Sequence, residues 1–335
     1  MINPGAMLVI VVFLAIFFDY INGFHDTANA IATSVSTRAL TPKRAVMLAA
    51  AFNLFGALYS TGVAQTIAKD IISPSLVTQI VVISALLSAI AWNLITWLMG
   101  IPSSSSHAIV GGMIGGAVAK AGFSVLQWEG IGKIVAALIF SPIVGMILGF
   151  IIMKSLMLVF GGFSPSHVNH GFKKMQVLSA ALLAFNHGSN DAQKSMGIIT
   201  MALIAAGLQS QAVLDPPIWV KLVCALAMSL GTAAGGWKII RTMGGKIFKL
   251  EPINGFAADL SSSIVIWTAT VFPSLHLPVS TTHVVSGSIM GVGSAKRVSA
   301  VRWGIAQQML IAWIVTIPTT SILAAIIYAG LSKII

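Results

Sequence analysis

A hydroxyl-rich run that follows a proline occurs twice in this chain, as IPSSSSHAIVGGMIGG at residues 101–116 and as LPVSTTHVVSGSIMG at residues 277–291. Both copies share the pattern Pro-x-Ser-[Ser/Thr]-[Ser/Thr]-His, and two glycines follow each histidine at the same positions. A pattern of this length does not recur by chance with every shared position in register. It therefore indicates an internal repeat, with one copy in each half of the chain.

A second, shorter motif also occurs twice and supports the same interpretation. Residues 23–30 read GFHDTANA and residues 188–195 read GSNDAQKS, so that Gly and Asp keep their spacing as Gly23/Asp26 and Gly188/Asp191. We therefore expect a first repeat at residues 1–160, a cytoplasmic linker at 161–175 and a second repeat at 176–335.

The composition places the chain in a membrane. Of its 335 residues, 57% are hydrophobic and 8% are charged, whereas soluble domains carry about 25% charged residues. Apolar runs of about 20 residues, long enough to span a bilayer, recur along the chain. The net charge of +11 is divided among short clusters between these runs, which excludes a soluble enzyme and a nucleic-acid binder and predicts a multi-pass protein whose partner is the lipid bilayer.

Four of the apolar regions are interrupted by Asp, Asn, His, Ser and Gly, and they lie at 22–37, 102–121, 176–208 and 278–295. Hydrocarbon offers no partners for such groups. We expect these regions to be broken or re-entrant helices that face protein or a water-filled cavity.

Charge placement predicts the topology. Basic clusters around Arg38, Lys173, Lys246 and Arg297 should be cytoplasmic by the positive-inside rule. If each interrupted region completes one passage, each half makes about five crossings, and this odd number makes the second half an inverted copy of the first. Both termini are then outside, and the broken helices of the two halves meet near the bilayer midplane, where secondary transporters bind substrate.

The motifs resemble those of the inorganic phosphate transporter (PiT) family of ion-coupled phosphate symporters. The resemblance rests on the two hydroxyl runs, on GFHDTANAIATSVSTRALTP at 23–42 and on AFNHGSNDAQKSMGI at 184–198, and it extends over essentially the whole chain. It implies an all-α symporter in the cytoplasmic membrane, and not an enzyme, that imports phosphate or a metal-phosphate complex. It also implies a homo-oligomer and no cofactor apart from the coupling H⁺ or Na⁺.

The hydroxyl runs are candidate phosphate ligands. A proline that opens a helix, followed by Ser and Thr, combines free backbone N–H groups, a positive dipole end and hydroxyl donors. The candidates are Ser104, Ser105, Ser106, Ser280, Thr281 and Thr282. The alternative is ordinary helix capping and hydroxyl bonding to the backbone. The glycines after each run, such as Gly115 and Gly291, are typical of close helix packing.

The coupling ion is expected at Asp26 and Asp191, because an ionised group inside a membrane costs at least about 2.5–3.5 kcal/mol without a partner. A proton or Na⁺ would compensate them, with neutral oxygen ligands from Asn22, Asn29 and Asn190. The alternative is that each Asp caps a half-helix. No dense ligand spacing predicts another metal site.

Lys194 breaks the symmetry of the repeats, because it occupies the position at which the first repeat has Asn29. An ammonium group there either stabilises the anionic substrate or neutralises Asp191, and it removes a ligand that Na⁺ would use. This feature resembles the bacterial, proton-coupled branch of the family, so H⁺ coupling is favoured. Na⁺ coupling and a sulfate or other oxyanion permease of the same fold are the alternatives.

Several other polar residues have weaker assignments. We expect His107 and His283 to be structural, and His25 is a better proton-relay candidate than His187. Asp259 lies near a basic cluster and is expected to form an ion pair, whereas Asp19 has no assigned role. A hydrolase lacks support because no nucleophile motif is present, and a channel lacks support because broken inverted repeats favour alternating access.

Overall fold

The computed structural model describes residues 3–73, 76–272 and 274–334, and within these ranges the chain is helical throughout apart from connecting segments. The α-helices are α1 (Pro4–Ser36), α2 (Pro42–Ala57), α3 (Gly62–Asp70), α4 (Gln79–Met99), α5 (Ser105–Ala121), α6 (Trp128–Phe160), α7 (Pro165–Ala205), α8 (Ile218–Ala234), α9 (Trp237–Arg241), α10 (Pro252–Val271), α11 (Thr281–Lys296) and α12 (Trp303–Leu331). The prediction of an all-α membrane protein is confirmed.

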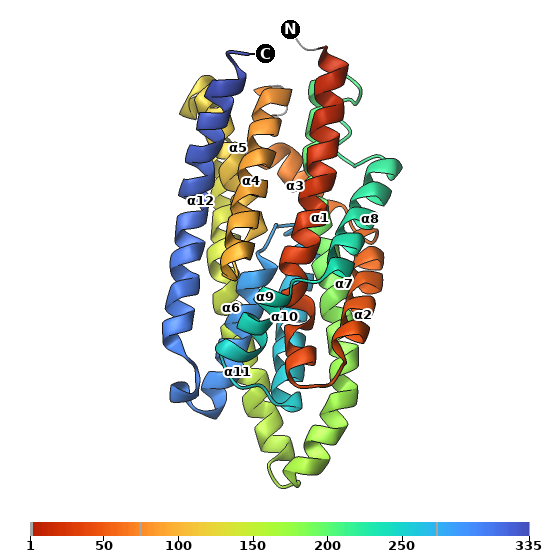
Figure 1. Ribbon diagram of the computed structural model, residues 1–335, viewed down its shortest axis with the longest axis vertical. Coiled ribbons are helices and arrows are strands. Elements are labelled where there is room, and N and C mark those ends of the chain that lie inside the picture. Colours follow the sequence, from red (N-terminus) through yellow and green to blue (C-terminus); the bar gives the residue numbers. More distant parts are fainter. Residues whose placement is uncertain (1–2, 74–75, 273, 335) are drawn as a thin grey trace.

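Long apolar helices form the body of the molecule and run along its longest axis (Figure 1). Among the described residues, α1, α4, α6 and α12 are each long and apolar enough to cross a membrane. Two bent pairs, α2 with α3 and α8 with α9 and the turn after it, raise the number of spans to six if each pair counts as one. Their bends are 66° and 61°.

The two bends have local causes in the sequence. Residues 58–61, which include the polar pair Ser60-Thr61, separate α2 from α3, and α8 is followed by Gly235, whose φ of +74° is in the left-handed region. A side chain on the next residue, Gly236, would overlap the backbone carbonyl of Phe24 in α1. The second bend therefore lets the chain pass close to α1 at a position that only glycine fits.

Two of the four predicted interruptions are wrong. The helices are not interrupted within residues 22–37 and 176–208, because α1 continues to Ser36 and α7 runs unbroken from Pro165 to Ala205. The polar side chains within them are buried against neighbouring helices rather than against lipid. Since protein supplies their hydrogen bonds, these helices have no need to unwind.

The other two interruptions, at the hydroxyl runs, are confirmed. Extended backbone precedes α5 and α11, and the side chains of Ser104 and Ser280 cap these helices by accepting from the N–H groups of His107 and His283. The pair α4/α5 lies toward the end of the molecule that holds both termini, whereas α11 extends toward the opposite end, where α6 turns into α7 (Figure 1). This arrangement is compatible with the inverted repeat, which stays a prediction, as does the side of the membrane that the termini face.

Glycines hold each of these two half-helices against one long helix. A Cβ on Gly115 would overlap the backbone carbonyl of Ser321 in α12, and a Cβ on Gly291 would overlap that of Met146 in α6. The half-helix of the first half thus packs on a helix of the second half, and the reverse also holds. The predicted close-packing role of these glycines is confirmed.

Candidate functional site: two helix starts that converge on paired carboxylates

The starts of α5 and α11 meet the carboxylates of α1 and α7 in the interior. The Ser105 hydroxyl donates to Asp26 Oδ2 at 2.9 Å, and the Thr282 hydroxyl donates to Asp26 Oδ1 at 3.2 Å. The Thr281 hydroxyl donates to Asp191 Oδ2 at 3.3 Å. All five residues are at most 2% exposed. The structure therefore brings the predicted phosphate ligands and the predicted coupling carboxylates into one buried site.

Further contacts join the two hydroxyl runs to each other and to α1. The Ser106 hydroxyl donates to the backbone carbonyl of Val279 at 3.0 Å, so the start of α5 contacts the extended segment before α11. The Asn29 amide donates to the hydroxyls of Thr281 and Thr282 at 3.2 and 2.9 Å. Asn29 Oδ1 has no partner among the described residues and is a free oxygen ligand beside the carboxylates.

Lys194 forms a buried ion pair instead of facing open space. Its ammonium group lies 2.6 Å from Asp191 Oδ1, and the same oxygen accepts a hydrogen bond from Asn190 at 2.7 Å. Both members of the pair have 0% exposure. Of the two roles predicted for Lys194, neutralisation of Asp191 is the one with a direct contact.

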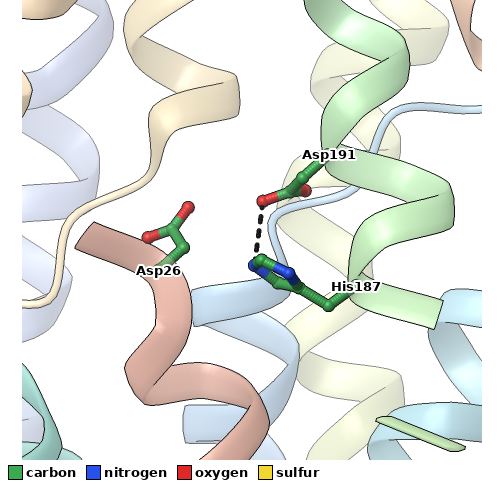
Figure 2. Close-up of side chains that lie close together, drawn as sticks. All are labelled: Asp26, His187 and Asp191. Carbon is green, nitrogen blue, oxygen red and sulfur yellow. Dashed lines mark ion pairs between the residues drawn. The ribbon is translucent and has the colours of Figure 1, made fainter. Parts of the chain in front are cut away.

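His187, which the sequence ranked below His25 as a proton-relay candidate, is a member of the site. Its Nε2 lies 3.3 Å from Asp191 Oδ2, and Figure 2 shows Asp26 of α1 across from this pair on α7. One ligand atom from each of Asp26, His187 and Asp191 lies within 4.8 Å of the others, as a bound cation requires. The spacing of four residues between His187 and Asp191 puts both on one helix face and was the available signal.

Three predicted site residues occupy supporting positions. Ser104 and Ser280 cap their helices, as described above. The Asn190 amide donates to the Val279 carbonyl at 2.9 Å and accepts from the Val279 N–H at 3.3 Å, so it holds the extended segment before α11. Asn22 is buried on α1, and neither its amide oxygen nor its amide nitrogen has a partner among the described residues.

The histidines near the hydroxyl runs connect the site to its surroundings. His25 Nδ1 lies 2.8 Å from Asp26 Oδ1, and its Nε2 lies 3.2 Å from the Thr96 hydroxyl of α4. The rings of His107 and His283 are 4.5 Å apart, and His283 stacks on Trp313 of α12 at 3.8 Å. The contact between the two histidine rings holds the starts of α5 and α11 beside each other.

Asp259 does not form the predicted ion pair. It is fully buried on α10, where its carboxylate accepts hydrogen bonds from the hydroxyls of Thr33 at 2.6 Å and Ser179 at 3.0 Å. No described basic side chain pairs with it; in the adjacent basic cluster, Lys296 pairs with Glu251. The expectation failed because Asp259 points into the helix bundle, whereas the basic residues of that cluster lie at its end.

Comparison with known proteins identifies the family. A model of the phosphate transporter family matches residues 22–164 and 161–324. The chain belongs to the phosphate transporter family. The resemblance seen in the motifs is thereby confirmed, and the protein is a multi-pass membrane protein of a transporter family rather than an enzyme.

Relatives of this phosphate transporter family member cover nearly its whole length. A probable low-affinity inorganic phosphate transporter of Bacillus subtilis is 54% identical over 98% of both chains. A probable low-affinity inorganic phosphate transporter of Rhizobium meliloti is 45% identical over 96% of both chains. The solved structure of a sodium-dependent phosphate transporter matches with a TM-score of 0.90 and 26% identity, over 98% of this chain and all of the other.

Proposed function

We propose that this phosphate transporter family member imports inorganic phosphate through alternating access and couples each import step to protons. The observation that carries the proposal is the convergence of two half-helix starts, rich in hydroxyl donors, on the buried pair Asp26 and Asp191. Helix starts bind oxyanions through free N–H groups and the helix dipole. The carboxylates supply the negative charge that a coupling cation needs.

The shared hydroxyls offer a reason why anion and cation would bind together. In this structure Ser105, Thr281 and Thr282 donate to the carboxylates. A proton or metal ion on a carboxylate weakens its demand for donors, so the hydroxyls become free to turn toward phosphate. Phosphate without the cation would face the buried Asp26 carboxylate, which has no fixed counter-charge like that of Lys194 on Asp191, and this is unfavourable.

The surroundings of His187 support a proton as the coupling ion. The Asn53 Nδ2 group donates to the Thr232 hydroxyl at 2.8 Å. In this amide orientation, Asn53 Oδ1 accepts a hydrogen bond from His187 Nδ1 at 3.1 Å. The other ring nitrogen of His187 faces Asp191 Oδ2, 3.3 Å away. A proton between this nitrogen and the carboxylate oxygen would be bound by both atoms, and it fits at this distance.

A sodium ion is the second candidate, because the solved structure with the same fold is that of a sodium-dependent phosphate transporter. The carboxylate of Asp26 and the free Oδ1 of Asn29 are the hard oxygen ligands that such an ion prefers. On α7, however, Lys194 already places an ammonium group on Asp191. This fixed charge favours the proton over a symmetric pair of sodium sites.

Purified protein in sodium-free proteoliposomes should accumulate labelled phosphate when the outside is more acidic than the inside. A protonophore should abolish this accumulation, because it removes the gradient that drives it. Excess sulfate should compete poorly, since phosphate alone retains an ionisable proton near neutral pH. Uptake that requires sodium and ignores the pH gradient would refute proton coupling, and equal competition by sulfate would refute phosphate selectivity.

The Ser105→Ala and Thr281→Ala variants should bind phosphate more weakly. Each lost hydrogen bond to a charged group costs roughly 1.5–3 kcal/mol, which corresponds to a binding constant about 10-fold weaker or more. Ser288→Ala is a matched control, because the Ser288 hydroxyl on α11 donates to the Gly145 carbonyl of α6, outside the site. Binding of labelled phosphate to the three purified variants would measure the effect, and unchanged affinity in both site variants would place the phosphate elsewhere.

A further inference from the structure

Two buried carboxylates lie outside the site described above, and neither forms an ion pair with a described residue. Asp19 on α1 and Asp259 on α10 both have 0% exposure. Asp19 accepts from the Ser195 hydroxyl at 2.7 Å, and Asp259 accepts from Thr33 and Ser179. An ionisable group at such a position is costly, and inside a membrane protein it is by default a candidate for a role in transport.

Asp19 and Thr33, the α1 residue that contacts Asp259, lie on opposite sides of the central site along α1. Asp19 precedes Asp26 by seven residues, and Thr33, which contacts Asp259, follows Asp26 by seven residues. At a rise of 1.5 Å per residue, each lies about 10 Å from Asp26 along the helix axis. Positions 19, 22, 26, 29 and 33 recur at intervals of three and four, so they share one face of α1.

Helix α7 completes the arrangement from the other side. Its Ser195 hydroxyl contacts Asp19 and its Ser179 hydroxyl contacts Asp259, with Asp191 between them in the sequence. Asp19 lies on α1 and contacts α7 through Ser195, whereas Asp259 contacts α1 through Thr33 and α7 through Ser179. Each outlying carboxylate is therefore linked to the two helices that carry Asp26 and Asp191. Together the three carboxylate positions form a polar line through the apolar bundle.

Buried polar atoms without protein partners fill the intervals of this line. Between Asp19 and Asp26 lies Asn22, with both amide atoms unpartnered, and between Asp26 and Thr33 lies Asn29, with its oxygen unpartnered. On the side of Asp259, Asn186 Oδ1 and the Ser263 hydroxyl are unpartnered, and the Asn186 amide donates to the Ser263 carbonyl at 3.1 Å. Buried polar atoms of this kind are satisfied by ordered water, which can also carry protons.

We propose that Asp19 and Asp259 are outlying proton-binding stations, one on each side of the central site, through which the coupling proton passes. This inference rests on the proposed proton coupling. At each station an O–H bond of a hydronium ion breaks as its proton forms an O–H bond with the carboxylate, which leaves a neutral water molecule. The new O–H bond then breaks as the proton passes to the next acceptor, and the carboxylate is restored.

The charged neighbours of the two stations differ. Asp19 is faced by Lys194 and Asp191 from α7, and the thiol of Cys224 from α8 lies beside it. Asp259 is packed among α1, α6, α7 and α11, and its polar neighbours there are the hydroxyls of Thr33 and Ser179. The station at Asp19 is therefore sensitive to the charge state of the central site, whereas the station at Asp259 is electrically more isolated.

The test compares two activities in proteoliposomes for Asp19→Asn and Asp259→Asn. Accumulation driven by a proton gradient should fall by about 100-fold, within the range that positioned proton-transfer groups contribute. Exchange of internal for external phosphate without a gradient requires no net proton transfer and should stay near that of the unchanged protein. Asp215→Asn is the matched control, because Asp215 lies in an exposed loop and pairs with Lys221.

A milder variant separates a proton station from a structural carboxylate. Thr33→Val keeps Asp259 but removes a hydroxyl that stabilises its ionised form, so the pH profile of accumulation should move to higher pH. Accumulation at full strength in both Asp variants, or equal loss of accumulation and exchange, would overturn the inference, and so would a fixed pH profile in Thr33→Val. Absence of proton-driven uptake in the unchanged protein would instead refute the proposed coupling, before any variant is compared.

Discussion

Phosphate uptake by an Asp26→Asn variant is expected to fall by at least about 100-fold, because the change removes the negative charge that would hold the coupling cation. The change also disturbs the hydrogen bonds that three groups make with the Asp26 carboxylate. His25, Ser105 and Thr282 all contact this carboxylate. An asparagine of the same size retains one acceptor but turns an amide N–H₂ toward these groups. The measurement is uptake of labelled phosphate into proteoliposomes under a proton gradient.

Two further variants make the Asp26 result specific. Asp26→Glu keeps the charge and should retain part of the activity, although its longer side chain displaces the hydrogen bonds. Asp215→Asn neutralises a carboxylate on the exposed loop and should transport as the unchanged protein does. Full proton-driven uptake by Asp26→Asn would contradict a role of Asp26 in coupling.

Loss of the Lys194 ammonium should destabilise the fold more than most single substitutions. In Lys194→Met the Asp191 carboxylate stays buried without its counter-charge, and breaking a buried pair from one side costs about 3–5 kcal/mol. Chemical denaturation of the purified protein in detergent measures this loss in the free energy of unfolding.

The partner variant tests whether the effect belongs to the pair. In the double variant Lys194→Met with Asp191→Asn no charge is left alone, so most of the lost stability should return. Additive losses from the two single changes would mean that Lys194 and Asp191 contribute independently, and that the ammonium has another partner.

Much of the site could be predicted from the sequence because duplication makes it visible. The hydroxyl run and the Asp motif each occur twice, so they stand out among apolar residues, and the breaks before Ser105 and Thr281 follow from their prolines. The pairing of Asp191 with Lys194 also follows from helical spacing of three residues. These features depend on neighbours in the sequence, which is why sequence reasoning reaches them.

The features that escaped prediction depend on partners far apart in the sequence. The continuity of α1 through Asp26 depends on donors from α5 and α11, and the position of Asp259 depends on Thr33 and Ser179 from two other helices. His187 could have been assigned from its spacing to Asp191, but its orientation depends on Asn53 of α2. The sequence pattern of one segment does not show which other helix will pack against it.

The packing of α5 on α12 and of α11 on α6 has a consequence for biosynthesis. The glycines of α5 fit the backbone of α12, which is synthesised after the other helices of the second half, so α5 must wait for them before it is enclosed. Until the second half is made, the Ser106 hydroxyl lacks its acceptor, the Val279 carbonyl, and the His107 ring lacks its neighbour, His283, and lipid cannot supply them. We therefore expect the first half to remain dependent on the insertion machinery during translation, and its native packing to form only after α12 has entered the membrane.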